Sequence, residues 1–315
     1  MSEQNVIDWL LDDDPSVRWQ VMRDLTDESA TAVRAERARV ATHGHGAQLL
    51  ALQAQDGRWG GAAWNRGWDS TMHVLWLLRE MGLDPDSGEA NVALARVRAN
   101  VTWRGCGPPE AEGNSFFAGE TEPCINGQVA AAGAYFRQDV RSLVSRLLDE
   151  QLPDGGWNCE AERGSTRSSF NTTICVLEAL LEYEHANGVD DKVNDARRRG
   201  EEYLLDRRLL RRKSTGERLD LDRKGRVPLT DLAFPCWWHY DALRALDYLR
   251  RCGVQPDARI GEAIELLQAK RGHDGRWRLE RQHPGRMPVE IDEREGTPSR
   301  WITLRAMRVL RWAGA

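Results

Sequence analysis

Apolar positions recur along the chain at the three-to-four-residue spacing of α-helices, and the first kind of segment that they form is apolar on nearly every side. Five such segments align with one another, which predicts a repeated, buried helix. The positions that align are Thr71, Gly127, Thr173, Asp241 and Thr303. A weaker sixth member covers residues 18–25 and follows Pro15, a residue type favoured in the first turn of a helix.

More polar segments alternate with these and predict a second set of helices. They cover residues 3–11, 30–53, 88–101, 139–151, 191–210 and 257–268. No segment shows the alternation of a half-buried strand. Six helices of each kind predict an all-α fold, an (α/α)6 toroid in which a ring of inner helices is surrounded by a ring of outer ones. We expect one domain over residues 1–315, with a central cavity and with the long loops gathered at one mouth.

A short phrase, QxxDGxW, follows three of the polar segments. Two copies run without a gap over residues 53–59 and 151–157, and we interpret residues 268–277 as a stretched third copy. Asp-Gly favours a tight turn, and Trp can pack its large face where one helix pair meets the next. We therefore interpret the phrase as a structural clamp and not as an active site.

The composition narrows the function classes. The 315 residues are 41% hydrophobic and 30% charged, and 44 Lys+Arg against 49 Asp+Glu give a net charge of -5. Such a balance creates no global field that attracts nucleic acid, so we expect no nucleic-acid partner. No apolar run reaches membrane-spanning length and no signal peptide is recognisable, so we expect a cytoplasmic protein without a transmembrane segment. A peripheral membrane contact and a second subunit stay open.

The clamp phrases and the six helix pairs together resemble the squalene cyclase and protein prenyltransferase superfamily, whose members are α/α toroids. The resemblance covers nearly the whole chain, and the strings at residues 120–127, 154–159, 234–241 and 298–301 are similar to a bacterial, single-toroid branch. It implies an apolar or isoprenoid-like substrate in the cavity. The Asp-x-Asp-Asp acid of class II terpene cyclases is absent, since Asp12, Asp13 and Asp14 do not fit that pattern.

The cysteines are candidate metal ligands. Six cysteines without a CxxC pair are too dilute for a disulfide scaffold, so they are buried thiols, metal ligands or nucleophiles. The resemblance to protein prenyltransferases implies a catalytic zinc held by Asp, Cys and His with one open position. Cys124, Cys159 and His239 fall where such ligands would lie, and Cys236 is an alternative to Cys159. The competing interpretation is that the thiols are buried apolar groups and that His239 belongs to a polar network. We expect no nucleotide cofactor.

Several carboxylates are candidate general acids or bases. We favour Asp69 and Asp241, then Glu120 and Glu122, because burial among Trp side chains would raise the pKa of a carboxyl group toward neutrality. His239 and Tyr240 are further catalytic candidates. Helix capping is the competing role, above all for Asp69, which immediately precedes an apolar helical run.

Aromatic side chains at the starts of the inner helices predict the lining of the cavity, and the chain has 13 Trp against 5 Phe and 5 Tyr. The substrate-binding candidates are Trp64, Trp68, Phe117, Asn126, Arg167, Phe170, Asn171, Trp237, Trp238, Arg300 and Trp301. Aromatic rings would surround an apolar chain and stabilise a positive centre, and the two arginines would hold an anionic group. The resulting hypothesis is an enzyme of cyclisation, isomerisation or group transfer. The alternative is a non-catalytic toroid that binds a lipid or a peptide end.

Overall fold

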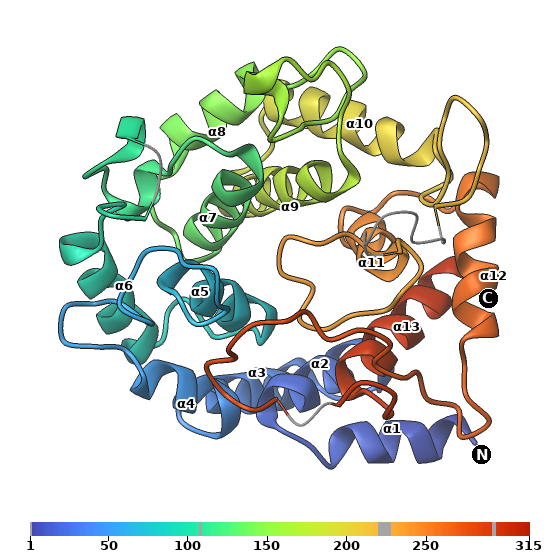
Figure 1. The fold of residues 1–315 in the computed structure, drawn as a ribbon. Coiled ribbons are helices and arrows are strands. Elements are labelled where there is room, and N and C mark those ends of the chain that lie inside the picture. The colour runs from blue at the N-terminus through green and yellow to red at the C-terminus, as the bar shows by residue number, and fades with distance from the viewer. Residues whose placement is uncertain (1, 107–108, 220–227, 292–293) are drawn as a thin grey trace. The chain divides into compact units, whose positions relative to one another are not determined.

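The computed structural model describes residues 2–106, 109–219, 228–291 and 294–315, which contain thirteen α-helices joined by loops and short 3-10 turns (Figure 1). Within these ranges the extended segments form isolated bridges and no strand. The prediction of an all-α fold is confirmed. Two compact units make up the chain: unit 1 comprises Met1–Arg37, Glu202–Pro284 and Ile291–Ala315, and unit 2 comprises Ala38–Glu201 and Gly285–Glu290. The closed ring, its central cavity and the single domain involve both units together and stay predictions.

Unit 2 is built on three buried helices that follow one another through the unit, α5 (Thr71–Glu80), α7 (Pro123–Tyr135) and α9 (Phe170–Asn187). The helix α7 packs against both of the others (Figure 1). Small residues allow this approach: a side chain at Gly127 would come within 2.7 Å of the backbone oxygen of Cys175 on α9. The helices α4 (Gly44–Ala51), α6 (Gly88–Asn100), α8 (Arg141–Asp149) and α10 (Asp191–Leu205) alternate with the buried ones along the chain.

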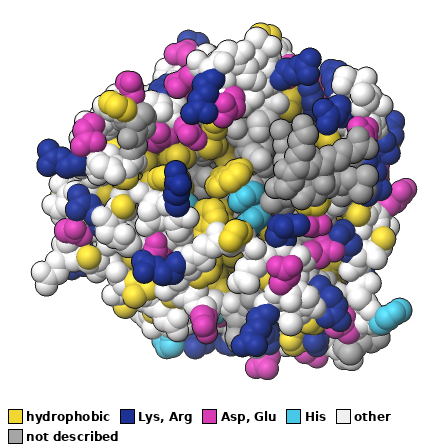
Figure 2. Space-filling model, in the orientation of Figure 1, with side chains coloured by type: hydrophobic (Ala, Val, Ile, Leu, Met, Phe, Trp, Pro, Cys, Tyr) yellow, Lys and Arg dark blue, Asp and Glu magenta, His cyan; other side chains and the backbone are white. Residues whose placement is uncertain are grey.

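Unit 1 repeats the plan with the buried helices α2 (Pro15–Leu25), α11 (Ala242–Arg251) and α13 (Arg300–Ala313), of which α13 contacts α2 and α11. The more exposed helices of this unit are α1 (Glu3–Leu11), α3 (Ala30–Ala38) and α12 (Gly261–Ala269). A buried ion pair ties α11 to α13, since the Arg308 guanidinium donates to the Asp247 carboxylate at 2.6 and 2.9 Å. Charged side chains of both signs are intermixed with hydrophobic ones on the face seen in Figure 2.

One predicted helix is divided in the structure. Residues 30–53 form α3, a 3-10 turn over Arg39–Ala41 and then α4. The reason is local: Gly44 has a φ of 65°, a left-handed conformation that ends one helical path and begins another.

The three clamps share one hydrogen-bonding plan. The indole nitrogen of each clamp Trp donates to a backbone oxygen in the preceding helix, at 2.6 to 2.7 Å. The backbone nitrogen of the same Trp donates to the hydroxyl of a Thr in the following buried helix, at 3.0 to 3.2 Å. The Trp–Thr pairs are Trp59–Thr71, Trp157–Thr173 and Trp277–Thr303. The structural role predicted for the phrase therefore has a physical basis in these bonds.

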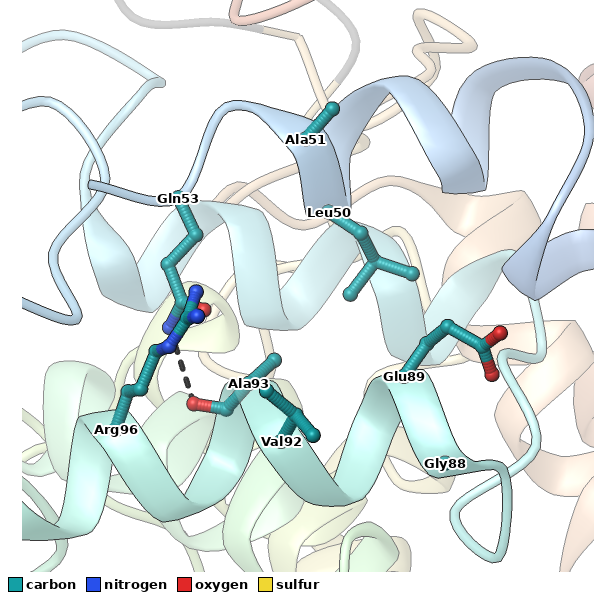
Figure 3. A pocket seen from close by; sticks show the side chains of 8 residues that line it. All are labelled: Leu50, Ala51, Gln53, Gly88, Glu89, Val92, Ala93 and Arg96. Atoms are coloured by element: carbon teal, nitrogen blue, oxygen red, sulfur yellow. Dashed lines mark hydrogen bonds between the residues drawn. The ribbon is translucent and has the colours of Figure 1, made fainter. Parts of the chain in front are cut away.

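The first residue of the clamp ties its turn to a neighbouring helix. The Gln53 amide donates to the Gly57 oxygen at 3.0 Å. It also donates to the Ala93 oxygen of α6 at 3.0 Å (Figure 3). Gln151 makes the equivalent pair of bonds. In the third clamp Arg271 occupies this place and donates to the Gly275 oxygen at 3.3 Å. The third copy therefore begins at Arg271 without a gap, and the stretched alignment from Gln268 is wrong.

Candidate functional site

Two thiols and one carboxylate converge in unit 2. Glu122 precedes α7, Cys124 lies in its first turn, and Cys159 lies in the loop between the second clamp and α9. The Cys124 Sγ lies 3.7 Å from Glu122 Oε2, and the three potential ligand atoms are all within 4.8 Å of one another. Cys124 is buried, Cys159 is half-buried and Glu122 is exposed, so the cluster opens toward solvent on the carboxylate side.

The loop that carries Glu122 is held by a buried amide. Asn126 accepts from the Glu120 backbone nitrogen at 2.8 Å and donates to the Glu120 backbone oxygen at 2.9 Å. The Glu122 nitrogen in turn donates to the Glu120 carboxylate at 2.6 Å. Asn126, which the sequence suggested as a substrate contact, is fully buried and positions this loop.

The two thiols differ in their acidity. The neighbouring Cys159 sulfur and burial both raise the pKa of the Cys124 thiol well above its usual value. The contact with Cys124 lowers the pKa of the Cys159 thiol, with further help from the Thr172 hydroxyl at 3.5 Å. Cys159 is therefore the thiol that ionises first. Burial also raises the pKa of the nearby Glu120 carboxyl.

His239 lies in unit 1 and stacks between two rings there. Its imidazole is 3.7 Å from the Trp238 ring and 3.6 Å from the His283 ring, measured between centroids. Burial and the neighbouring His283 lower the pKa of His239 to about 3, so the ring is neutral near pH 7. Its role as a zinc ligand with Cys124 and Cys159 would join the two units and stays a prediction.

The pKa of the Asp69 carboxyl is shifted in the opposite direction from the one expected. Burial alone would raise its pKa, but Arg286 and Asn65 donate hydrogen bonds to the carboxylate and the net pKa is lowered. The Asn65 amide lies at 3.0 Å and the Arg286 Nε at 2.7 Å. The expectation of a raised pKa is thus wrong for Asp69. Capping is wrong as well, since Ser70 holds the N-cap position of α5.

Asp241 is the N-cap of α11, whereas the sequence interpretation placed this residue inside the helix. Its carboxylate accepts from the Arg244 backbone nitrogen at 2.8 Å, and α11 begins only at the next residue, Ala242. Full burial raises its pKa, in the direction expected. The Cys236 thiol lies 3.6 Å from this carboxylate and also receives a bond from Arg305 at 3.4 Å.

Two further candidates are engaged in structural bonds. The Tyr240 hydroxyl is buried and donates to the Leu209 backbone oxygen at 2.8 Å, and burial raises its pKa well above 10. The Arg300 guanidinium lies over the Trp9 ring at 4.7 Å and forms an ion pair with Asp13 at 3.7 Å. Both side chains therefore stabilise unit 1 in the described contacts.

The predicted aromatic lining divides by exposure. Trp238 is the most accessible of these rings, at 38%, and Trp64 and Phe170 are half-buried. Asn171 is half-buried and Arg167 is exposed. The rings that are buried, and so packed mainly against protein, are Trp68, Phe117, Trp237 and Trp301.

The sequence interpretation missed two residues that contact the candidate site residues, Arg286 and His283. Arg286 reaches Asp69 across 217 residues, and Trp68 donates its backbone nitrogen to the Arg286 oxygen at 3.1 Å. His283 stacks on His239 from a loop that has no repeat partner. Neither contact has a sequence signal, because both residues lie in the irregular stretch before α13.

Comparisons with known proteins leave the activity open. No known protein-family profile matches the chain, and no curated protein matches it. A crystal structure of a protein from Actinoplanes aligns over 100% of both chains with 17% identity and a TM-score of 0.47. The apo form of a type II terpene cyclase from Scytonema aligns over 95% of this chain and 85% of its own with 18% identity and a TM-score of 0.43. Within the described residues no helix is long and apolar enough to cross a membrane.

Proposed function

We propose that the chain is a metal-dependent enzyme whose centre is formed by Glu122, Cys124 and Cys159, and that it acts on an apolar or isoprenoid-like small molecule. The observation that supports this proposal is the convergence of three ligand atoms within 4.8 Å in unit 2. Thiolate and carboxylate ligands suit Zn²⁺, and three protein ligands leave a fourth position for a substrate or water. Glu122 replaces His239 as the third ligand in this proposal.

One of the three distances between the ligand atoms fits such an ion. A tetrahedral Zn²⁺ with Zn–S near 2.3 Å and Zn–O near 2.1 Å places neighbouring sulfur and oxygen ligands about 3.6 Å apart. The Cys124 Sγ to Glu122 Oε2 distance is 3.7 Å. The proximity of the two thiols also fits, because a bound cation would displace the thiol protons.

The surrounding residues define how the centre would work. A bound Zn²⁺ supplies Lewis acidity and lowers the pKa of a thiol or water at its open position, which favours group transfer among the candidate reactions. Thr172 orients the Cys159 sulfur, and Glu120 fixes the backbone of Glu122. Phe170 and Asn171 begin the same helix as Thr172 and are half-buried, so they are the candidate contacts for the apolar substrate.

Metal analysis tests the centre directly. Protein purified without chelator should contain about one zinc per chain, and Cys124→Ser and Cys159→Ser should each lose it. Cys252→Ser is the matched control, since Cys252 lies outside the cluster and bonds to the Leu249 backbone oxygen. Retention of zinc in His239→Ala and loss in Glu122→Gln would distinguish the two ligand sets. Folded wild-type protein without zinc would refute the metal proposal.

A second experiment separates the enzyme from the receptor. Native mass spectrometry of the zinc-loaded protein should detect a co-purified apolar ligand, and incubation with candidate isoprenoid donors and thiol acceptors should change that ligand chemically. The Cys159→Ser variant should bind ligand without converting it. Binding without conversion in the wild type would favour the alternative of a non-catalytic, lipid- or peptide-binding protein.

A further inference from the structure

Two of the exposed hydrophobic side chains of the described residues lie at the neighbouring helices α4 and α6 of unit 2. Within the described residues, the large hydrophobic side chains that are exposed are Leu52, Val92, Val189 and Trp238. Leu52 follows α4 directly and is 51% exposed, and Val92 lies on α6 and is 54% exposed. A shallow groove of about 480 Å³ runs between these two helices, with Leu50 and Val92 directed into it (Figure 3). The groove is a small apolar surface on the exterior of unit 2.

The helix α6 carries apolar residues on two faces. Its buried face consists of Ala90, Ala93, Leu94 and Val97, which pack into unit 2. Its other face exposes Val92, Ala95 and Ala99 at helical spacing. An outer helix that faced only water would carry polar residues at these positions. Val92, Ala95 and Ala99 therefore form a narrow apolar stripe on the exposed side of α6, flanked by the charged residues Glu89, Arg96 and Arg98.

The charges at the groove are arranged for self-pairing. Glu89 and Arg96 lie on α6 at opposite ends of the groove, with Val92 between them (Figure 3). Both are exposed, and in the part of the chain that the structure describes neither forms an ion pair. Seven residues correspond to about two helical turns, so the two charges lie on the same side of the helix, about 10 Å apart along its axis.

We propose that this surface, formed by the outer faces of α4 and α6, binds a second copy of the chain to form a homodimer with twofold symmetry. If two copies of α6 pack antiparallel about Val92, Glu89 of each copy faces Arg96 of the other. A twofold contact requires a self-complementary surface, and one charge of each sign on either side of an apolar centre satisfies this requirement. A membrane surface would instead favour a rim of basic side chains, which Glu89 interrupts.

Charge exchange tests the proposal. In sedimentation velocity over about 1 to 100 µM protein, the wild type should convert from monomer to dimer. Glu89→Arg or Arg96→Glu alone places two like-charged pairs across the interface and should raise the dimer Kd about tenfold. The double exchange of both residues restores the pairs and should return the Kd to within about threefold of the wild type.

Two further variants serve as controls for the charge exchange. Arg141→Glu changes an exposed arginine on α8 of the same unit and should leave the dimer Kd unchanged. Val92→Lys removes the apolar centre and should abolish the dimer, with an unchanged urea midpoint because Val92 is exposed. A wild type that stays monomeric over this range, or a double exchange no better than the single ones, overturns the proposal. A dimer whose Kd is unchanged by all three single substitutions on α6 overturns it as well.

Discussion

The threonines that receive the clamp Trp nitrogens should each contribute a similar, measurable part of the stability. Thr173 is fully buried, and its hydroxyl lies 3.1 Å from the Trp157 nitrogen and 3.4 Å from the Trp157 oxygen. Thr173→Val keeps the size of the side chain but leaves the Trp157 N–H without its acceptor. An unsatisfied buried donor costs about 1–3 kcal/mol, and the added apolar methyl group offsets up to about 0.8 kcal/mol. The net loss should therefore lie between about 0.2 and 3 kcal/mol, with a central value of about 1–2 kcal/mol.

The repeats supply replicates and a control for this experiment. Thr71→Val and Thr303→Val remove the equivalent acceptor, so each should lower the free energy of unfolding by a similar amount. Thr172→Val is the control, because its hydroxyl contacts the Cys159 sulfur and no clamp nitrogen. Urea unfolding followed by Trp fluorescence gives the free energies, and hydrogen exchange at Trp157 reports the local bond. Equal stabilities of Thr173→Val and Thr172→Val would refute the reasoning.

Two buried ionisable groups give further predictions. Burial lowers the pKa of His73 to about 3, so the folded state binds fewer protons than the unfolded state, and stability that is complete above about pH 6.5 is lost as the pH falls. At pH 5.5 His73 should lower the free energy of unfolding by about 1.4 kcal/mol relative to pH 7.5. The His73→Gln variant should lack this part of the decline. Parallel pH profiles of stability for the variant and the wild type would contradict the prediction. Asp247→Leu leaves the Arg308 guanidinium buried without its main partner and should cost about 3–5 kcal/mol, whereas Asp247→Leu with Arg308→Met should recover more than half. A double variant as unstable as the single one would count against a paired role.

Much of the helical plan was accessible from the sequence because it rests on periodicity. The alignment that made Thr71, Thr173 and Thr303 equivalent is confirmed by the same hydroxyl bond in all three clamps. Local backbone conformation was harder to infer. The left-handed Gly44 divides one expected helix, and Arg271 takes the place of a clamp Gln because its longer side chain reaches the same turn oxygen.

The chemistry of single side chains depended on contacts that no spacing reveals. In the sequence Asp69 and Asp241 were both favoured as general acids or bases with a raised pKa. In the structure Arg286 lowers the pKa of Asp69, whereas burial raises that of Asp241. The difference comes from an arginine 217 positions away in an irregular loop. Glu122 was expected as an acid, and only its distance to Cys124 makes it a candidate ligand.

The clamps also explain where candidate chemistry can lie. The buried helices that follow a clamp, α5, α9 and α13, use a first-turn Thr to fix the loop before them. The helices α7 and α11 have Gly127 and Asp241 at the aligned position and no clamp before them, so their loops need other supports. Asn126 holds the loop before α7, and the Asp241 carboxylate caps α11. Because these two loops are not bound by the repeat, they can hold polar groups in other arrangements, and the thiol–carboxylate contacts of Cys124 and Cys236 lie beside them.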